Sequence, residues 1–294
     1  MPCVETPRLS ADIETVAMER VPGSTHWQTV QDLCKTRLEE AGYEVELDTY
    51  DTGVNVIGRR PGLRPDAGLV IVSAHYDHIG GCPGASDNAA GIASALEVAR
   101  VLAHRENQHP LVIACWDEEE TGLVGSRAYA AKTNAANTPV SAMFSFDAIG
   151  YISNEPDSQA LPAGFGAVFP DQEAELVANQ NRGDFVALVS DEGSATITSS
   201  FIAHADSINL KTIAMELPES LKLSTVTSDL RRSDHAAFWE LDYPGIQLTD
   251  TADFRNPNYH CRDGIDLPST LDVDFLGKVV QATIGASIDV LDAP

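Results

Sequence analysis

Side chains that can bind metal ions and move protons gather in one stretch of the sequence, residues 71–126. They are His75, Asp77, Asp87, Glu119 and Glu120. Zinc binds histidine nitrogen and carboxylate oxygen, and catalytic zinc sites keep one position open for water. A carboxylate beside a metal-bound water that does not itself bind the metal can act as a general base. These residue types therefore predict metal-assisted hydrolysis.

Two apolar runs with the character of β-strands, 69–74 and 111–116, each end directly before these polar side chains. Between the runs, apolar residues recur at the three-to-four-residue period of a helix, at Ile92, Leu96, Ala99 and Ala103. A strand–helix–strand order predicts neighbouring parallel strands whose carboxyl ends lie at one edge of a sheet. Ligands bind at that edge in open α/β sheets, so we expect the candidates to converge there.

Further carboxylates extend this set. Asp147 follows a third apolar run, 140–146. Two metal ions about 3.5–4 Å apart need a carboxylate that binds both, and Asp87, which we expect to open the helix, is the natural bridge. A run such as Glu118–Glu120 is more often the solvated start of a helix. Its position after a buried strand favours a role in the site instead.

Six motifs occur in a characteristic order. They are H-Y-D at 75–77, G-A-S-D-N-A-A-G at 84–91, E-E-T-G-L-V-G-S at 119–126, F-D-A-I-G at 146–150, S-D-H-A-A-F at 233–238 and N-Y-H at 258–260. Together they resemble the MH-clan zinc aminopeptidases, metallopeptidase family twenty-eight, to which the glutaminyl cyclases are related. The resemblance covers roughly residues 53–291. It implies a three-layer αβα sandwich around a mixed, mostly parallel sheet.

The resemblance also implies two zinc ions per chain. By the pattern of the family, His75 and Asp147 would bind one zinc, Glu120 and His260 would bind the other, and Asp87 would bind both. The metals would hold the carbonyl oxygen of the substrate and a bridging water.

The same pattern implies three roles next to the metals. Glu119 would be the general base, Asp77 would orient His75 through its other ring nitrogen, and Tyr259 would polarise the scissile carbonyl. His235 competes with His260 for the last ligand position, and the N-Y-H motif favours His260. His78 is expected to be a loop histidine with its hydrogen bonds satisfied, and a pocket residue is the alternative.

The function implied by the resemblance is an aminopeptidase that releases amino-terminal residues from peptides. A carboxypeptidase or dipeptidase stays open, because the family contains carboxypeptidases. An alternative on the same fold is a single-zinc glutaminyl cyclase, although such relatives depart from the D-N-x-x-G pattern that this chain keeps. A non-catalytic domain that retains the fold is a further alternative.

Alternating strand-like and helical segments predict a single domain over residues 1–294, with a helical segment at 1–50 packed on it. We expect helices within 9–42, divided at Pro22-Gly23, and a hairpin at 43–59. Asp234 is expected to cap a short helix that ends at Trp239. The remaining segments are predicted strands at 140–146, 185–190, 212–217 and 243–248 and helices at 122–131, 172–180, 195–205 and 271–288.

The chain is strongly acidic, with 44 Asp and Glu against 19 Lys and Arg and a formal charge of −25. This charge repels phosphate backbones and anionic lipids, so nucleic acid and membrane surfaces are not expected partners. It suits cations and substrates with a free amino group. No apolar run approaches the length of a membrane span, and residues 1–20 lack the pattern of a signal peptide. Export stays open, because a mature form without its leader would have the same sequence.

The five cysteines are Cys3, Cys34, Cys82, Cys115 and Cys261. If the loops that carry Cys82 and Cys261 line one site, these two could form a disulfide. We expect Cys115 to be a buried free thiol, and a Cys3–Cys34 disulfide is a weaker possibility. Two disulfides would favour an oxidising compartment, and five reduced cysteines would favour the cytosol. The expected location is secreted or periplasmic, and the cytoplasm is the open alternative.

Overall fold

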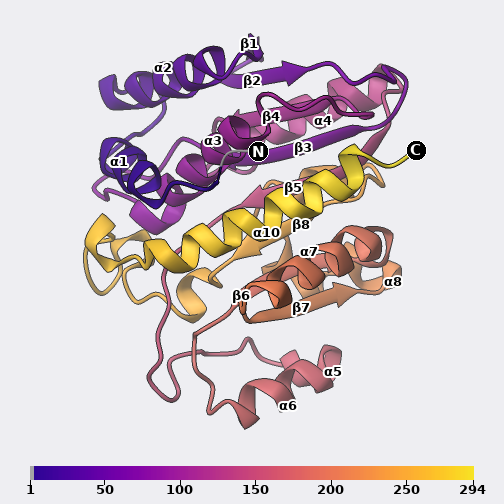
Figure 1. Ribbon diagram of the computed structural model, residues 1–294. Helices are drawn as coiled ribbons and strands as arrows, with labels where there is room; N and C mark the ends of the chain where they lie inside the picture. Colours follow the sequence, from indigo (N-terminus) through magenta and orange to yellow (C-terminus); the bar gives the residue numbers. More distant parts are fainter. Residues whose placement is uncertain (1–2) are drawn as a thin grey trace.

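The computed structural model describes residues 3–294, and its strands form one mixed sheet (Figure 1). In space the strands follow the order β1-β2-β4-β3-β5-β8-β6-β7. Their bounds are β1 Glu44–Thr49, β2 Val54–Arg60, β3 Leu69–His75, β4 Leu111–Trp116, β5 Val140–Phe146, β6 Val186–Asp191, β7 Thr212–Leu217 and β8 Ile246–Thr249. The pairs β3–β4, β3–β5, β5–β8 and β6–β7 are parallel and the others are antiparallel. The predicted mixed, mostly parallel sheet is confirmed.

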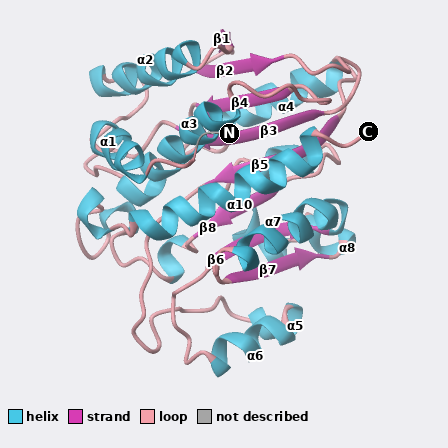
Figure 2. Ribbon diagram, viewed as in Figure 1, coloured by secondary structure: helices cyan, strands magenta, loops and turns pink. Residues whose placement is uncertain are grey.

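Helices cover both faces of the sheet and complete a three-layer αβα sandwich (Figure 2). One face carries α1 Thr6–Val16, α2 Thr25–Glu40, α3 Ala90–Leu102, α7 Ala195–Ser207 and α10 Val273–Leu291. The other carries α4 Val124–Ala135, α5 Phe165–Val168, α6 Pro170–Ala178 and α9 His235–Trp239. The short α8, Glu219–Lys222, lies in the polar segment after β7. Within residues 3–294, no helix combines the length and apolar character needed to cross a membrane.

Strands β3 and β4 are buried along almost their whole length, as expected for parallel strands covered by helices on both faces. Val72 of β3 packs with the helices of one face, while its neighbour Ile71 packs with those of the other. The two strands pair with His75 opposite Trp116, and β5 lies on the other side of β3. The carboxyl ends of all three strands therefore meet at one edge, as the strand order predicted.

The turn before α3 differs from the prediction. Asp87 does not open a helix, because α3 begins at Ala90 and Asp87 has non-helical backbone angles, with φ −120° and ψ 94°. The carboxylate of Asp266 accepts hydrogen bonds from the backbone N–H groups of Ser86 and Asp87 and holds this turn. A contact between residues so far apart in the sequence is invisible to a local pattern.

Two other boundaries also differ. Asp234 precedes α9, but its side chain makes no capping hydrogen bond, and the carboxylate is buried. Strand β8 begins at Ile246 rather than at Tyr243, since Pro244 has no backbone N–H to donate to a neighbouring strand.

The structure contains two disulfides. The predicted Cys82–Cys261 disulfide is confirmed. The prediction of a free Cys115 is wrong, because Cys115 of β4 pairs with Cys34, which lies on the buried side of α2. The Cys3–Cys34 alternative is therefore also wrong. Cys3 is exposed and is the free cysteine of residues 3–294.

Candidate metal centre

The edge formed by the carboxyl ends of β3, β4 and β5 gathers metal-binding side chains from distant parts of the chain. Within residues 3–294, their donor atoms form two groups, each with all its atoms within 4.8 Å of one another. The first group is His75, Glu119 and Asp147. The second is His78, Asp87, Glu120 and His260. Every residue predicted to bind metal therefore lies in one of the two groups.

Asp87 lies between the groups, and its two carboxylate oxygens face different histidines. Oδ1 is 3.1 Å from Nε2 of His75, and Oδ2 is 2.9 Å from Nε2 of His260. On the outer sides, Oδ1 of Asp147 is 3.5 Å from Nε2 of His75, and Oε2 of Glu120 is 3.2 Å from Nε2 of His260. A carboxylate shared by two cations needs this kind of arrangement.

The donor atoms fit metal ions because they are buried and lack ordinary partners. Nε2 of His75, Nε2 of His260 and Oδ1 of Asp87 make no hydrogen bond within residues 3–294. Burial alone would lower the pKa of His75, but the carboxylates around it, Glu119 foremost, raise that pKa well above its ordinary value. The site therefore attracts positive charge strongly. Histidine nitrogens and carboxylate oxygens are donors that suit zinc.

Glu119 occupies a distinct position in the first group. Its side chain is 9% exposed, and Oε2 lies 3.9 Å from Nε2 of His75, farther than the contacts of Asp87 and Asp147. Burial raises the pKa of Glu119 well above its ordinary value. A carboxylate with a raised pKa that lies near metal ligands without being a ligand itself is suited to accept and return a proton.

Asp77 supports this region in a way that the sequence did not predict. Its carboxylate accepts hydrogen bonds from the backbone N–H groups of Glu119 (3.0 Å) and Glu120 (3.2 Å). Nδ1 of His75 lies 3.5 Å from that carboxylate and hydrogen-bonds to the backbone carbonyl of Asp77 at 3.2 Å. Asp77 thus positions the two glutamates as well as the histidine.

Two further histidines lie near the centre in different surroundings. His78 is buried, and its Nδ1 is 2.7 Å from Oε1 of Glu120, so it belongs to the site more closely than a loop histidine would. His235 lies in α9 instead, where its Nε2 hydrogen-bonds to the backbone carbonyl of Leu230 and its ring packs against Trp239. Burial lowers the pKa of His235 to about 4.

Arg20 is a residue of the site region that sequence reasoning missed. It lies between α1 and α2, is fully buried, and donates hydrogen bonds to the backbone carbonyls of Tyr76, Pro83, Gly84 and Asp87. Burial lowers its pKa to about 10. One guanidinium therefore fixes both ends of the loop that leads from β3 to Asp87. No motif signals this role, because a single arginine in a polar linker is ordinary.

Tyr259 lies beside His260, and their rings stack with centroids 4.0 Å apart. Nη2 of Arg232 donates to the Tyr259 hydroxyl at 3.3 Å. The guanidinium groups of Arg232 and Arg262 both approach the tyrosine ring, and both bind Asp253 at 2.9 Å. The phenol is thereby held at the mouth of an adjoining pocket.

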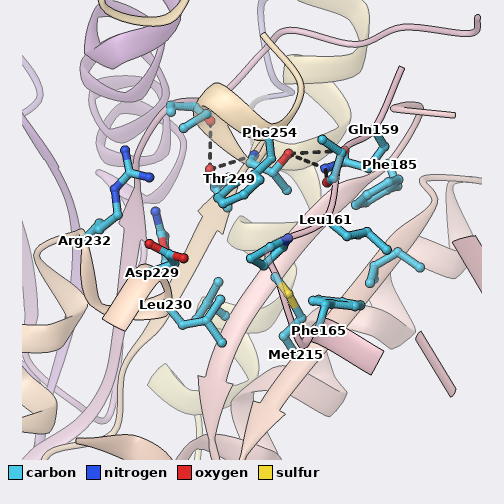
Figure 3. A pocket seen from close by; sticks show the side chains of 18 of the residues that line it. Gln159, Leu161, Phe165, Phe185, Met215, Asp229, Leu230, Arg232, Thr249 and Phe254 are labelled. Carbon is cyan, nitrogen blue, oxygen red and sulfur yellow. Dashed lines mark hydrogen bonds between the residues drawn. The ribbon is translucent and has the colours of Figure 1, made fainter. Parts of the chain in front are cut away.

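Asp147 and Tyr259 are among the residues that line this pocket, which Figure 3 shows from close by. It encloses about 740 Å³ including its open mouth. Asp229 and Arg232 lie near one another in Figure 3, and apolar side chains line the opposite part. These apolar residues include Leu161, Phe165, Leu176, Phe185, Ile213 and Met215.

The sequence of this chain matches the family described as "Peptidase family M28" over residues 55–284. The chain therefore belongs to peptidase family M28, which confirms the resemblance that its motifs indicated. Among curated proteins, it is 29% identical over 231 residues to the uncharacterized protein YfbL of Escherichia coli, covering 74% of this chain and 66% of YfbL. The chain spans about two thirds or less of the length of the curated relatives first matched.

Solved structures share the fold at low sequence identity. BSAP, a zinc aminopeptidase from Bacillus subtilis, superposes with a TM-score of 0.73 and 13% identity, covering 99% of this chain and 96% of that one. The glutaminyl cyclase of Porphyromonas gingivalis superposes with a TM-score of 0.68 and 16% identity, covering 97% and 98%. These similarities establish the α/β fold, which serves both kinds of enzyme.

Proposed function

We propose that this protein is a zinc-dependent aminopeptidase that binds two zinc ions at the edge of its sheet. The observation that carries the proposal is the position of Asp87, with one carboxylate oxygen at 3.1 Å from His75 and the other at 2.9 Å from His260. A single-metal site needs no such central carboxylate. Membership in peptidase family M28 supports peptide hydrolysis as the reaction.

The proposed ligands follow from the two groups of donors. His75 and Asp147 would hold one zinc, Glu120 and His260 would hold the other, and Asp87 would contribute to both. We assign His78 to orienting Glu120 through their 2.7 Å contact, because a partner that hydrogen-bonds to a metal-binding carboxylate fixes its direction.

The chain's own residues then perform the proton transfers. Bound zinc supplies an activated water and polarises the scissile carbonyl. Glu119 accepts a proton from the attacking water and passes it to the leaving amine, and burial, which raises its pKa, suits it to both steps. The hydroxyl of Tyr259 donates a hydrogen bond to the carbonyl oxygen, where negative charge develops.

The adjoining pocket supports a preference for peptides whose amino-terminal residue has a large apolar side chain. The pocket opens next to Asp147 and Tyr259, so it lies where a side chain flanking the scissile bond would be. Burying apolar surface there contributes roughly 25 cal/mol per Å². The free amino group of such a peptide is a cation, and the surplus carboxylates around Glu119 favour it over a terminal carboxylate.

A single-zinc glutaminyl cyclase is the second candidate, favoured by the fold shared with the Porphyromonas gingivalis enzyme. Metal content separates the two candidates: about two zinc ions per chain support the peptidase, and one supports the cyclase. Peptides that begin with glutamine provide a second measure, since a cyclase releases ammonia from them and a peptidase releases the amino acid.

The test is an assay of metal-replete protein on aminoacyl substrates and their N-acetylated counterparts, with and without a chelator. The proposal predicts chelator-sensitive hydrolysis of leucyl and phenylalanyl substrates, little activity on aspartyl ones, and none on acetylated ones. Metal-replete protein that cleaves no amide, or that prefers the acetylated substrates, would overturn it.

A further inference from the structure

The turn that carries His260 lies near the surface, between two anchored residues. Buried Asn256 donates a hydrogen bond to Ser86, and buried Asp266 accepts hydrogen bonds from Ser86 and Asp87. No residue from 257 to 265 is buried. The side chain of His260 is 24% exposed, against 1% for His75, and its ring stacks on that of Tyr259.

The backbone of this turn is also unfavourable in itself. His260 and Cys261 both have positive φ, 53° and 55°. Side chains beyond glycine rarely adopt this left-handed region, because the Cβ atom crowds the backbone. Two such residues in succession persist only where the surroundings impose them.

The Cys82–Cys261 disulfide links the turn that carries His260 to a buried, well-anchored loop. Cys82 is 1% exposed, and its Cα atom lies 5.7 Å from that of Cys261. The next two residues, Pro83 and Gly84, accept hydrogen bonds from the buried guanidinium of Arg20. The disulfide thus connects an exposed turn to a loop that is anchored in the interior.

We propose that the Cys82–Cys261 disulfide holds His260 in place as a metal ligand, and that metal binding by the second group is therefore sensitive to reduction. The inference rests on the proposed function for the identity of the metal. Reduction breaks the S–S bond and forms the S–H bonds of Cys82 and Cys261. The two electrons come from two thiols, which become a disulfide, or from a phosphine, which becomes a phosphine oxide with oxygen from water. The turn is then free to relax, and His260 loses its fixed distance from Asp87 and Glu120.

The chain provides a matched control in its other disulfide. Cys34–Cys115 links α2 to β4 in the interior, and both cysteines are fully buried. The double variants Cys82→Ser/Cys261→Ser and Cys34→Ser/Cys115→Ser each lose one disulfide and keep the same number of cysteines. A general loss of stability would affect both variants, whereas loss of ligand positioning would affect only the first.

The measurement is zinc affinity by competition with a chromogenic chelator, together with zinc content after dialysis and circular dichroism to show folding. We expect Cys82→Ser/Cys261→Ser to keep one tight zinc and to bind the other about 10- to 100-fold more weakly, the range found when groups that orient ligands are removed. The control variant should bind both as the unaltered protein does. Equal zinc affinities in the two variants would overturn the proposal.

Reduction of the folded, unaltered protein tests the proposal if Cys82→Ser/Cys261→Ser does not fold. A phosphine should reach the partly exposed Cys261 before the buried Cys34 and Cys115, and mass spectrometry of alkylated aliquots identifies the reduced pair. Loss of one zinc in step with reduction of Cys82–Cys261 supports the proposal, and full zinc retention overturns it. Because affinity is measured without peptide, a protein that binds two zinc ions but cleaves nothing would refute the proposed function alone.

Discussion

Glu119 tests the proposed reaction at the scale of a single residue. Its side chain belongs to the first group of donors, with Oε2 3.9 Å from Nε2 of His75, but we do not propose it as a ligand. Glu119→Ala should therefore retain zinc while kcat falls by about 10²- to 10⁴-fold, the usual contribution of a general base. Steady-state kinetics and zinc content on one preparation check this. Unchanged turnover would remove Glu119 as the base, and loss of zinc would make it a ligand.

We expect substitution of His260 to reduce zinc binding and substitution of His235 to leave it unchanged. Nε2 of His260 faces Asp87 and Glu120 at 2.9 and 3.2 Å, whereas His235 is engaged with Leu230 and Trp239 in α9. His260→Ala should reduce zinc from about two to about one per chain. His235→Ala should leave the zinc content of the folded protein unchanged. The reverse order, measured by atomic absorption, would exchange the two assignments.

His235 should also make the fold sensitive to acid. Burial lowers its pKa in the folded protein to about 4 from the ordinary 6.5, so the unfolded chain takes up this proton at a higher pH. The stability linked to His235 is fully present above pH 6.5 and is lost as the pH falls through 4. At pH 4 the loss amounts to about 3 kcal/mol.

His235→Gln removes this titration and keeps an N–H donor for Leu230. The variant is expected to be less stable than the unaltered protein at pH 7 but to lose less stability on acidification. Urea unfolding at pH 4.5 and 7.5 measures both changes. Parallel losses in the two proteins would show that His235 does not titrate with a lowered pKa.

At the scale of elements, the most reliable predictions from the sequence were the strands whose bounds depend on local hydrophobic pattern alone. Strands β4, β5 and β7 occupy the predicted residues, because buried apolar runs bounded by polar residues have few alternative structures. His75 and Asp147 can be located because each comes at the end of an apolar run, whereas the assignment of Asp87, Glu120 and His260 depends on the family motifs. The strand–helix–strand order then placed the ends of β3 and β4 at one edge.

What the sequence could not predict depends on contacts between distant segments. The pairing of Cys34 with Cys115 required the position of α2 on the sheet, which no local pattern contains. The Asp87 turn departs from a helix because Asp266 holds its N–H groups from far along the chain. The sequence does not decide between a loop and a pocket role for His78 for the same reason, since its contact with Glu120 exists only after β3 and β4 pair.

Arg20 shows how an element outside the matched family region shapes the site. The family match begins at residue 55, yet this arginine from the α1–α2 linker holds the loop that leads to Asp87. Arg20→Ala leaves several buried carbonyls without a donor, each costing about 1–3 kcal/mol. We expect the free energy of unfolding to fall by about 3 kcal/mol or more. Arg20→Lys should recover only part of this, because lysine lacks the planar fork of donors.

Lys35 provides the control in the neighbouring helix α2. It is 41% exposed and forms an ion pair with Glu39, which is 48% exposed. Exposed pairs of this kind contribute at most about 1 kcal/mol, so Lys35→Ala should be mild. Urea unfolding of the three variants checks the order. Equal losses for Arg20→Ala and Lys35→Ala would show that Arg20 has no special role.

At the scale of the whole molecule, covalent links and charge act together. The two disulfides join α2 to β4 and the loop after β3 to the turn at Cys261, so each connects segments that are far apart in the sequence. Disulfides persist in oxidising surroundings, and the expected secreted or periplasmic location is consistent with them. The formal charge of −25 adds a long-range field that favours approaching cations.

This field leads to a prediction about substrate charge and salt. For two peptides with the same amino-terminal leucine, one continued by lysines and the other by glutamates, kcat/KM at low ionic strength should be at least about 10-fold higher for the basic peptide. The advantage should shrink as salt shortens the screening length from about 30 Å at 0.01 M to about 3 Å at 1 M. Because the amino-terminal residue is unchanged, the apolar pocket contributes equally to both peptides. If the two salt curves run parallel, the difference reflects short-range contacts and the net charge does not guide the substrate.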